Sequence, residues 1–158
     1  MSKISLKQAA AWCGGTVKEK YADIEFLGAN NDTRTLQPGQ LFLALQGARD
    51  GHEFIPAALE KGAAAVITAR KPEEDVPYVL VASDRLALAR TACNFYGNPA
   101  TSMKLIGITG TNGKTSVTLL LKSVLEQTRG AKVGLVGTMG NMIGQEAIAS
   151  DRTTPESL

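Results

Sequence analysis

Aromatic residues and cysteines are scarce in this sequence of 158 residues. Aromatics make up 5%, and the two cysteines, Cys13 and Cys93, stand far apart without a CxxC partner. This pattern argues against a disulfide framework or a zinc site, so we expect two buried, reduced thiols. Apolar runs reach only five residues, which excludes a membrane span. The first fifteen residues also lack the apolar core of a secretory signal, so we expect a cytoplasmic protein with no membrane partner.

An excess of charge of one sign is also lacking. The 17 Lys and Arg residues nearly balance the 15 Asp and Glu residues, and the two signs are interspersed along the chain. Without a basic stripe, the sequence gives no support for nucleic-acid binding. Hydrophobic residues make up 44%, which excludes a disordered chain. The length predicts one domain, or one small domain and part of another.

Capping residues and apolar periodicity predict that strands and helices alternate. Ser5 and Ser83 can each cap a helix, and Gly14, Gly62 and Gly130 can each end one. The expected helices span 6–13, 54–61, 84–96 and 114–127, and the expected strands span 24–29, 41–45, 64–68, 78–81, 104–109 and 133–136. Strands that alternate with helices favour an α/β fold with parallel pairing.

A domain boundary is expected where Gly97, Asn98 and Pro99 interrupt the chain. Residues 1–100 are predicted to form a small N-terminal α/β domain. Residues 101–158 are predicted to form the first βαβ unit of a phosphate-loop (P-loop) domain. One such unit is too small for a stable nucleotide-binding domain, so we expect this second domain to be incomplete.

A glycine-rich segment with the sequence GITGTNGKTS, residues 107–116, carries the strongest chemical signal. It follows a predicted strand and opens a predicted helix, where backbone amides and the helix N-terminus favour phosphate. Lys114 is predicted to reach the β and γ phosphates of ATP, and the Thr115 hydroxyl to bind Mg²⁺. The segment departs from the general phosphate-loop spacing, because Ile108 stands where the first glycine is expected. The predicted ATP-binding residues are Gly110, Thr111, Asn112, Gly113, Lys114, Thr115 and Ser116.

Three further motifs are ambiguous when each is read alone. The segment 32–34 (Asp-Thr-Arg) is typical of an ordinary turn, and 50–52 (Asp-Gly-His) of a hydrogen-bonded loop, although either could bind or react. The segment 152–156 (Arg-Thr-Thr-Pro-Glu) fits a helix start with a capping box. The same segment could equally be a helix N-terminus that binds an anion.

Together the four motifs resemble those of the Mur ligases, a family of ATP-dependent peptidoglycan-precursor ligases. GITGTNGKTS resembles their short-spaced ATP loop, and DTR, PGQLFLAL and DGHEFI resemble their N-terminal, UDP-binding domain. RTTPESL is similar to the matching segment of the members that add the third residue of the stem peptide. The resemblance runs along nearly the whole chain and implies cytoplasmic cell-wall synthesis, with consequences for cell shape and division.

The resemblance also implies a reaction and the residues that serve it. ATP would phosphorylate the terminal carboxylate of UDP-N-acetylmuramoyl-L-alanyl-D-glutamate, and the amine of an amino acid would attack the acyl phosphate. Lys114 is implied as the catalytic cation, with Mg²⁺ at Thr115. The implied substrate-binding residues are Thr33, Arg34, Arg152, Thr153 and Thr154. Since family members have three domains, the C-terminal domains would be missing here, and we expect the chain alone not to ligate.

Three alternatives stay open at this point. The segments ISLKQAAAWCGG, DTR and GHEFIPAALEKGAAAVI resemble at least as closely the members that add D-alanyl-D-alanine to a UDP-tripeptide. The chain could also be a non-catalytic UDP-sugar-binding module with a vestigial loop. A small phosphate-loop kinase would need a second metal-binding acid after a later strand, where Glu146 is the nearest acid.

Overall fold

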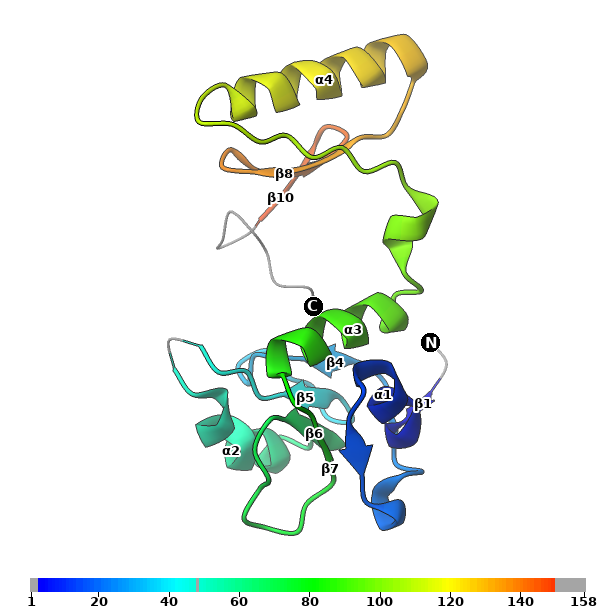
Figure 1. Cartoon of the computed structure of the whole chain (residues 1–158), viewed down its shortest axis with the longest axis vertical. Coiled ribbons are helices and arrows are strands. Elements are labelled where there is room, and N and C mark those ends of the chain that lie inside the picture. The colour runs from blue at the N-terminus through cyan, green and yellow to red at the C-terminus, as the bar shows by residue number, and fades with distance from the viewer. Residues whose placement is uncertain (1–2, 48, 150–158) are drawn as a thin grey trace. The chain divides into compact units, whose positions relative to one another are not determined.

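The computed structural model describes residues 3–47 and 49–149, which divide into two compact units (Figure 1). Unit 1 extends to Ser102, and unit 2 begins at Met103. Unit 1 is a layered α/β structure, whereas unit 2 combines one long helix with an antiparallel sheet. Within the described ranges, none of the helices combines the length and the hydropathy needed to cross a bilayer.

Unit 1 is built on a five-stranded sheet with the strand order β2-β7-β6-β5-β4. Strands β4 to β7 are parallel, and β2 pairs antiparallel with β7. The strands of this sheet are β2 (Thr16–Val17), β4 (Ala29–Asn30), β5 (Leu41–Leu43), β6 (Ala65–Thr68) and β7 (Tyr78–Leu80). A separate two-stranded sheet pairs β1 (Ile4–Ser5) with β3 (Glu25–Phe26). The parallel pairing confirms the predicted α/β class.

The two longer helices of unit 1 begin where their capping residues predict, and the first also ends at its predicted glycine. The hydroxyl oxygens of Ser5 and Ser83 accept hydrogen bonds from first-turn amides, and Gly14 ends the first helix at a φ of 67°. This positive φ favours glycine, which has no Cβ to clash. The helical segments of unit 1 are α1 (Leu6–Cys13), η1 (Glu19–Tyr21), η2 (Gly51–Phe54), α2 (Ile55–Glu60), α3 (Asp84–Phe95) and η3 (Pro99–Ser102).

Side-chain alternation along the central strands divides the core of unit 1 into two layers. Leu41 and Leu43 of β5 pack in the cluster that contains α1 and α3, whereas Phe42 packs with residues of α2. Figure 1 accordingly shows α1 and α3 on one side of the sheet and α2 on the other. An unbroken apolar run is what a strand covered on both faces requires.

The strand expected over 24–29 is in fact two strands in different sheets. Glu25–Phe26 pairs with β1, whereas Ala29–Asn30 pairs with β5. The backbone changes partner in between, where the Leu27 amide donates to the Gly39 carbonyl and the Gly28 carbonyl accepts from the Leu41 amide. Apolar periodicity does not reveal that the chain passes from one sheet to another, because both strands bury part of their surface.

The two thiols have different surroundings, which corrects the expectation that both are buried. Cys13 is buried, but Cys93 is exposed. The buried face of α3 passes through Ala87, Leu88 and Thr91 to Ala92, and Cys93 lies one position beyond it. A helix turns about 100° per residue, so Cys93 lies about 200° from Thr91 and therefore outside the buried face.

Unit 2 consists of the helix α4 (Lys114–Arg129) and a three-stranded antiparallel sheet. The strands are β8 (Gly134–Gly137), β9 (Gly140–Ile143) and β10 (Glu146–Ile148), with β9 in the centre. The helix ends at Gly130 with a φ of 58°, which confirms the predicted glycine stop. β8 was expected, but the hairpin strands β9 and β10 were not.

The prediction of a strand over 104–109 is wrong within the described part of the chain. Those residues form no strand, and Leu105 and Ile106 are 72% and 59% exposed. A strand needs a neighbour for its backbone hydrogen bonds, and within residues 103–149 β8 pairs only with β9. The described part of unit 2 is therefore a helix with an antiparallel meander, and residues 103–149 do not form the expected βαβ arrangement.

Candidate functional site

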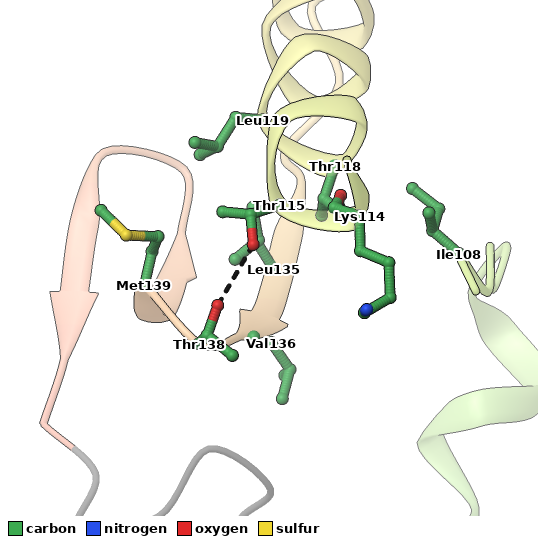
Figure 2. Close-up of a pocket in the computed structure, with 10 residues that line it drawn as sticks. Ile108, Lys114, Thr115, Thr118, Leu119, Leu135, Val136, Thr138 and Met139 are labelled. Atoms are coloured by element: carbon green, nitrogen blue, oxygen red, sulfur yellow. Dashed lines mark hydrogen bonds between the residues drawn. The ribbon is translucent and has the colours of Figure 1, made fainter. Parts of the chain in front are cut away.

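A pocket of about 200 Å³ lies in unit 2 between the start of α4 and the turn that joins β8 to β9 (Figure 2). Polar groups reach it from the first turns of the helix and from the hairpin turn. Its lining residues are Ile108, Lys114, Thr115, Thr118, Leu119, Leu135, Val136, Gly137, Thr138 and Met139. The predicted phosphate loop and the end of a strand thus meet at one cavity.

Two glycines give the loop before α4 its backbone shape. Gly110 has a φ of 152° and Gly113 a φ of 77°, and both values favour glycine. The space around a Cβ at Gly113 is open, so the backbone angle and not crowding calls for glycine there. Gly113 is the N-cap and has no side chain to accept from the first amides of α4. Those amides lack hydrogen-bond partners within the helix. Together with the partial positive charge of the helix N-terminus, they favour the binding of an anion.

The Lys114 and Thr115 side chains extend from this first turn, Thr115 toward Thr138 and Lys114 on the side of Ile108 (Figure 2). The Lys114 ammonium donates to the Gly110 carbonyl oxygen at 2.6 Å, so it folds back over the loop. The Thr115 and Thr138 hydroxyl oxygens are 3.1 Å apart, and either can donate. A cation and a hydroxyl at a helix N-terminus therefore line one pocket, an arrangement suited to a polyphosphate.

The Asp32–Thr33–Arg34 turn follows β4 in unit 1. The Arg34 guanidinium donates to the Asp32 carboxylate, with a shortest distance of 2.6 Å, and the Arg34 amide donates to it at 2.8 Å. These bonds hold the pKa of Asp32 below its usual range. The Lys61 ammonium donates to the Thr33 carbonyl oxygen at 2.6 Å. The turn lies at the carboxyl end of a parallel strand, where open α/β sheets bind ligands.

The Asp50–Gly51–His52 segment is a hydrogen-bonded loop. The Asp50 carboxylate lies 2.5 Å from His52 Nδ1 and accepts from the Arg70 guanidinium at 2.7 Å. Its bonds to His52 lower the pKa of Asp50. His52 Nε2 is buried and finds no hydrogen-bond partner within the described ranges. The contacts favour the structural interpretation of this motif, in which Asp50 fixes the loop between β5 and α2.

Two family profiles match the sequence on either side of the boundary between the units. Residues 23–96 match the catalytic domain of the Mur ligase family, and residues 108–158 match the Mur ligase middle domain. Together the two matches cover most of the chain.

The chain belongs to the Mur ligase family.

Its relatives include UDP-N-acetylmuramoyl-L-alanyl-D-glutamate–2,6-diaminopimelate ligase of Caldanaerobacter subterraneus, which is 49% identical over 139 residues. That match covers 86% of this chain and 29% of the relative. The chain therefore spans less than a third of the length of the curated Mur ligases that it matches.

Solved Mur ligase structures resemble the fold of the chain. UDP-N-acetylmuramoylalanyl-D-glutamyl-2,6-diaminopimelate–D-alanyl-D-alanyl ligase from Acinetobacter baumannii is 26% identical with a TM-score of 0.62, covering 85% of this chain and 32% of that one. MurF ligase from Thermotoga maritima, solved in complex with ADP, is 36% identical with a TM-score of 0.52, covering 64% of this chain and 23% of that one.

In this Mur ligase chain, the structure brings only part of the predicted loop to the pocket. Lys114 and Thr115 line it, and Gly110 is tied to it through the lysine. Thr111, Asn112 and Ser116 are exposed and are not among the lining residues. The predicted residues Arg152, Thr153 and Thr154 lie outside the described residues.

Thr138 and Met139 line the pocket but were not predicted. The available signal was their place just beyond the strand expected over 133–136, with Gly137 between, because ligands of parallel α/β sheets bind at the carboxyl ends of the strands.

The residues at this Mur ligase pocket fit magnesium better than a softer metal. The Thr115 hydroxyl is a hard oxygen donor, and Mg²⁺ is commonly held by one or two protein oxygens together with substrate phosphates and water. Across residues 3–47 and 49–149, no cluster of three or more His, Cys, Asp or Glu side chains could hold a metal. Thr115 is therefore the candidate donor in the described part of the chain, with nucleotide phosphates completing the set.

Proposed function

We propose that the chain carries the ATP-binding and UDP-substrate-binding parts of a ligase that adds the third amino acid to UDP-N-acetylmuramoyl-L-alanyl-D-glutamate. One observation carries the proposal. Lys114 and Thr115 stand at one pocket behind a glycine-shaped loop, in a chain 49% identical to a ligase with that name. The names of these relatives give 2,6-diaminopimelate as the added residue, and we take it as the candidate amino acid for the whole ligase.

Unit 2 would bind the nucleotide. The Lys114 ammonium would leave the Gly110 carbonyl and bind the β and γ phosphates, while the first-turn amides of α4 hold phosphate oxygens. Mg²⁺, when bound at Thr115, neutralises charge on the phosphates. The γ-phosphoryl group passes to the substrate carboxylate and ADP leaves. The amine of the amino acid then attacks the acyl phosphate, forms the amide bond and releases phosphate.

Unit 1 would hold the uridine diphosphate end of the substrate through Thr33 and Arg34. Asp32 already fixes Arg34 by direct hydrogen bonds, so the guanidinium is oriented before a ligand arrives. Arg152, Thr153 and Thr154 would hold the muramoyl-peptide part. Binding of the substrate far from its reacting carboxylate is useful, because correct orientation of two substrates can lower the activation barrier by up to ~7–11 kcal/mol.

We also propose a cellular compartment for the reaction and an activity for the chain on its own. ATP and a UDP-linked precursor would both be available in the cytoplasm, where we place the protein. Since the chain spans 29% of the relative's length, we expect the chain alone to bind ligands without ligating them. A coupled assay for ADP release, with UDP-muramoyl-dipeptide and an amino acid, checks this, and turnover would contradict it.

A D-alanyl-D-alanine-adding ligase is the second candidate. The solved structure from Acinetobacter baumannii, which carries that name, favours it at 26% identity. UDP-dipeptide and UDP-tripeptide distinguish the two enzymes, because each takes one of them as the acceptor. Tighter binding of the tripeptide form by the chain would favour this second candidate.

The nucleotide test uses Lys114→Ala, with Lys132→Ala as the matched control. Lys132 is an exposed lysine of unit 2 that does not line the pocket. Hydrogen bonds to charged groups contribute ~1.5–3 kcal/mol, so we expect Lys114→Ala to weaken Mg-ATP binding about ten- to hundredfold. Amide shifts of isotope-labelled protein measure this. Unchanged binding in Lys114→Ala would reject the proposed role and favour a vestigial loop.

The substrate test uses Thr33→Ala, with Thr16→Ala as the control on the opposite edge of the sheet. We expect UDP-N-acetylmuramoyl-dipeptide to shift the amides of Thr33 and Arg34, and Thr33→Ala to remove most of that response. Equal responses in both variants would exclude this turn as the substrate contact.

A further inference from the structure

Thr138 occupies a constrained position beside the predicted metal ligand. Gly137 pairs with Gly140 in the register of β8 and β9, so Thr138 and Met139 form the two-residue turn of the hairpin. Leu135 is buried and anchors β8 near this turn. Thr138 lines the pocket, and its hydroxyl oxygen lies 3.1 Å from that of Thr115 (Figure 2).

In other phosphate-loop proteins a second side chain shares the metal site with the hydroxyl of the loop. In P-loop NTPases the loop Ser or Thr binds Mg²⁺ together with an Asp from a second conserved motif. Here the residue next to the loop hydroxyl is a neutral threonine. The side chains that line the pocket in the described residues also include no Asp or Glu.

The chemistry of the hydroxyl group determines which threonine donates the hydrogen bond and which accepts it when a metal is bound. A hydroxyl has one hydrogen and two lone pairs, so two facing hydroxyls form one hydrogen bond in one direction. When the Thr115 oxygen gives a lone pair to a cation, its hydrogen must point away from the metal. Thr138 is the hydroxyl placed to accept that hydrogen.

We propose that Thr138 is a positioning residue that accepts the Thr115 hydroxyl hydrogen and so turns the Thr115 lone pair toward the nucleotide-bound Mg²⁺. This inference rests on the proposed ATP function and adds a residue to it. Thr138 acts through Thr115 and does not itself bind the metal. Its loss should therefore weaken the contribution of Mg²⁺ to ATP binding and leave metal-free ATP binding unchanged.

The test compares ATP dissociation constants of the 158-residue chain with Mg²⁺ and with excess EDTA. Thr138→Val removes the hydroxyl at nearly constant shape, and Thr138→Ser restores it. Thr128→Val is the matched control, because the Thr128 hydroxyl donates to the Val124 carbonyl oxygen within α4 and does not line the pocket. One hydrogen bond predicts that Thr138→Val lowers the Mg²⁺-dependent gain in affinity about three- to tenfold.

Each outcome bears on a different claim. A reduced gain in Thr138→Val, with wild-type gains in Thr138→Ser and Thr128→Val, supports the inference. An unchanged gain in Thr138→Val overturns it, as does an equal loss of ATP affinity with and without Mg²⁺. If the wild-type chain binds ATP but Mg²⁺ adds nothing, the inference fails while nucleotide binding stands. Failure of the wild-type chain to bind ATP at all would reject the proposed function itself.

Discussion

Gly51 is the residue at which a single methyl group should most clearly disturb the loop between β5 and α2. A Cβ at Gly51 would lie 2.4 Å from the Leu45 carbonyl oxygen and 2.6 Å from the Leu45 nitrogen. Both contacts are with backbone, so no side chain can rotate away, and the Gly51 amide bond to that same carbonyl at 2.9 Å must also deform. Overpacking costs ~1–3 kcal/mol and a lost hydrogen bond ~1 kcal/mol. We expect Gly51→Ala to destabilise unit 1 by about 2–4 kcal/mol.

Gly47→Ala is the matched control in the same loop. A Cβ at Gly47 meets nothing closer than the Arg49 carbonyl oxygen at 3.7 Å, which is an ordinary contact. Replacing glycine where alanine fits stabilises by ~0.4–1 kcal/mol, so the two variants should change stability in opposite directions. Urea unfolding followed by the fluorescence of Trp12 reports on unit 1 alone, because Trp12 is the single tryptophan and packs against its core. Equal midpoints for the two variants would refute the steric reasoning.

Two further predictions concern charge and reactivity. Lys18 and Lys20 hold the pKa of the Asp75 carboxyl far below its usual range. The resulting stability is present above about pH 4, the unfolded value, and is lost as pH falls toward the folded pKa. Asp75→Asn should therefore flatten the acid dependence of the urea midpoint below about pH 4, and an unchanged slope would contradict the ion pairs. Exposed Cys93 should react with a thiol reagent well before Cys13, whose pKa is raised by burial. Equal labelling rates, followed by mass spectrometry of peptides, would contradict the burial of Cys13.

Elements with local signals were predicted well from the sequence. The Ser83 cap is confirmed in α3 and the Gly130 stop in α4, because capping depends on a few neighbouring residues. The run over 24–29 was predicted less well, since its division between two sheets depends on partners far away in sequence. Segments 140–143 and 146–148 were missed because their alternation is weak and is interrupted by two glycines with positive φ, Gly140 and Gly144.

The candidate site shows the same division between local and distant information. Lys114 and Thr115 could be identified because the loop that carries them is continuous in sequence and its glycines constrain the backbone. Thr138 was not predicted as a site residue, since it meets Thr115 only when a hairpin 23 positions further along the chain folds beside the helix.

The exposed segment 104–109 shows why a strongly apolar pattern is not sufficient for a strand. Leu105 and Ile106 are typical of a strand buried within a parallel sheet, and such a strand needs neighbours on both edges and cover on both faces. The described part of unit 2 provides an antiparallel meander whose strands already pair with one another. The segment consequently leads into the glycine loop without a ladder, while α4 and β8 still bring Lys114 and Thr138 to one pocket. Among the described residues, the loop, the helix and the hairpin line the pocket, so the positions of the proposed phosphate-binding groups depend on these three elements.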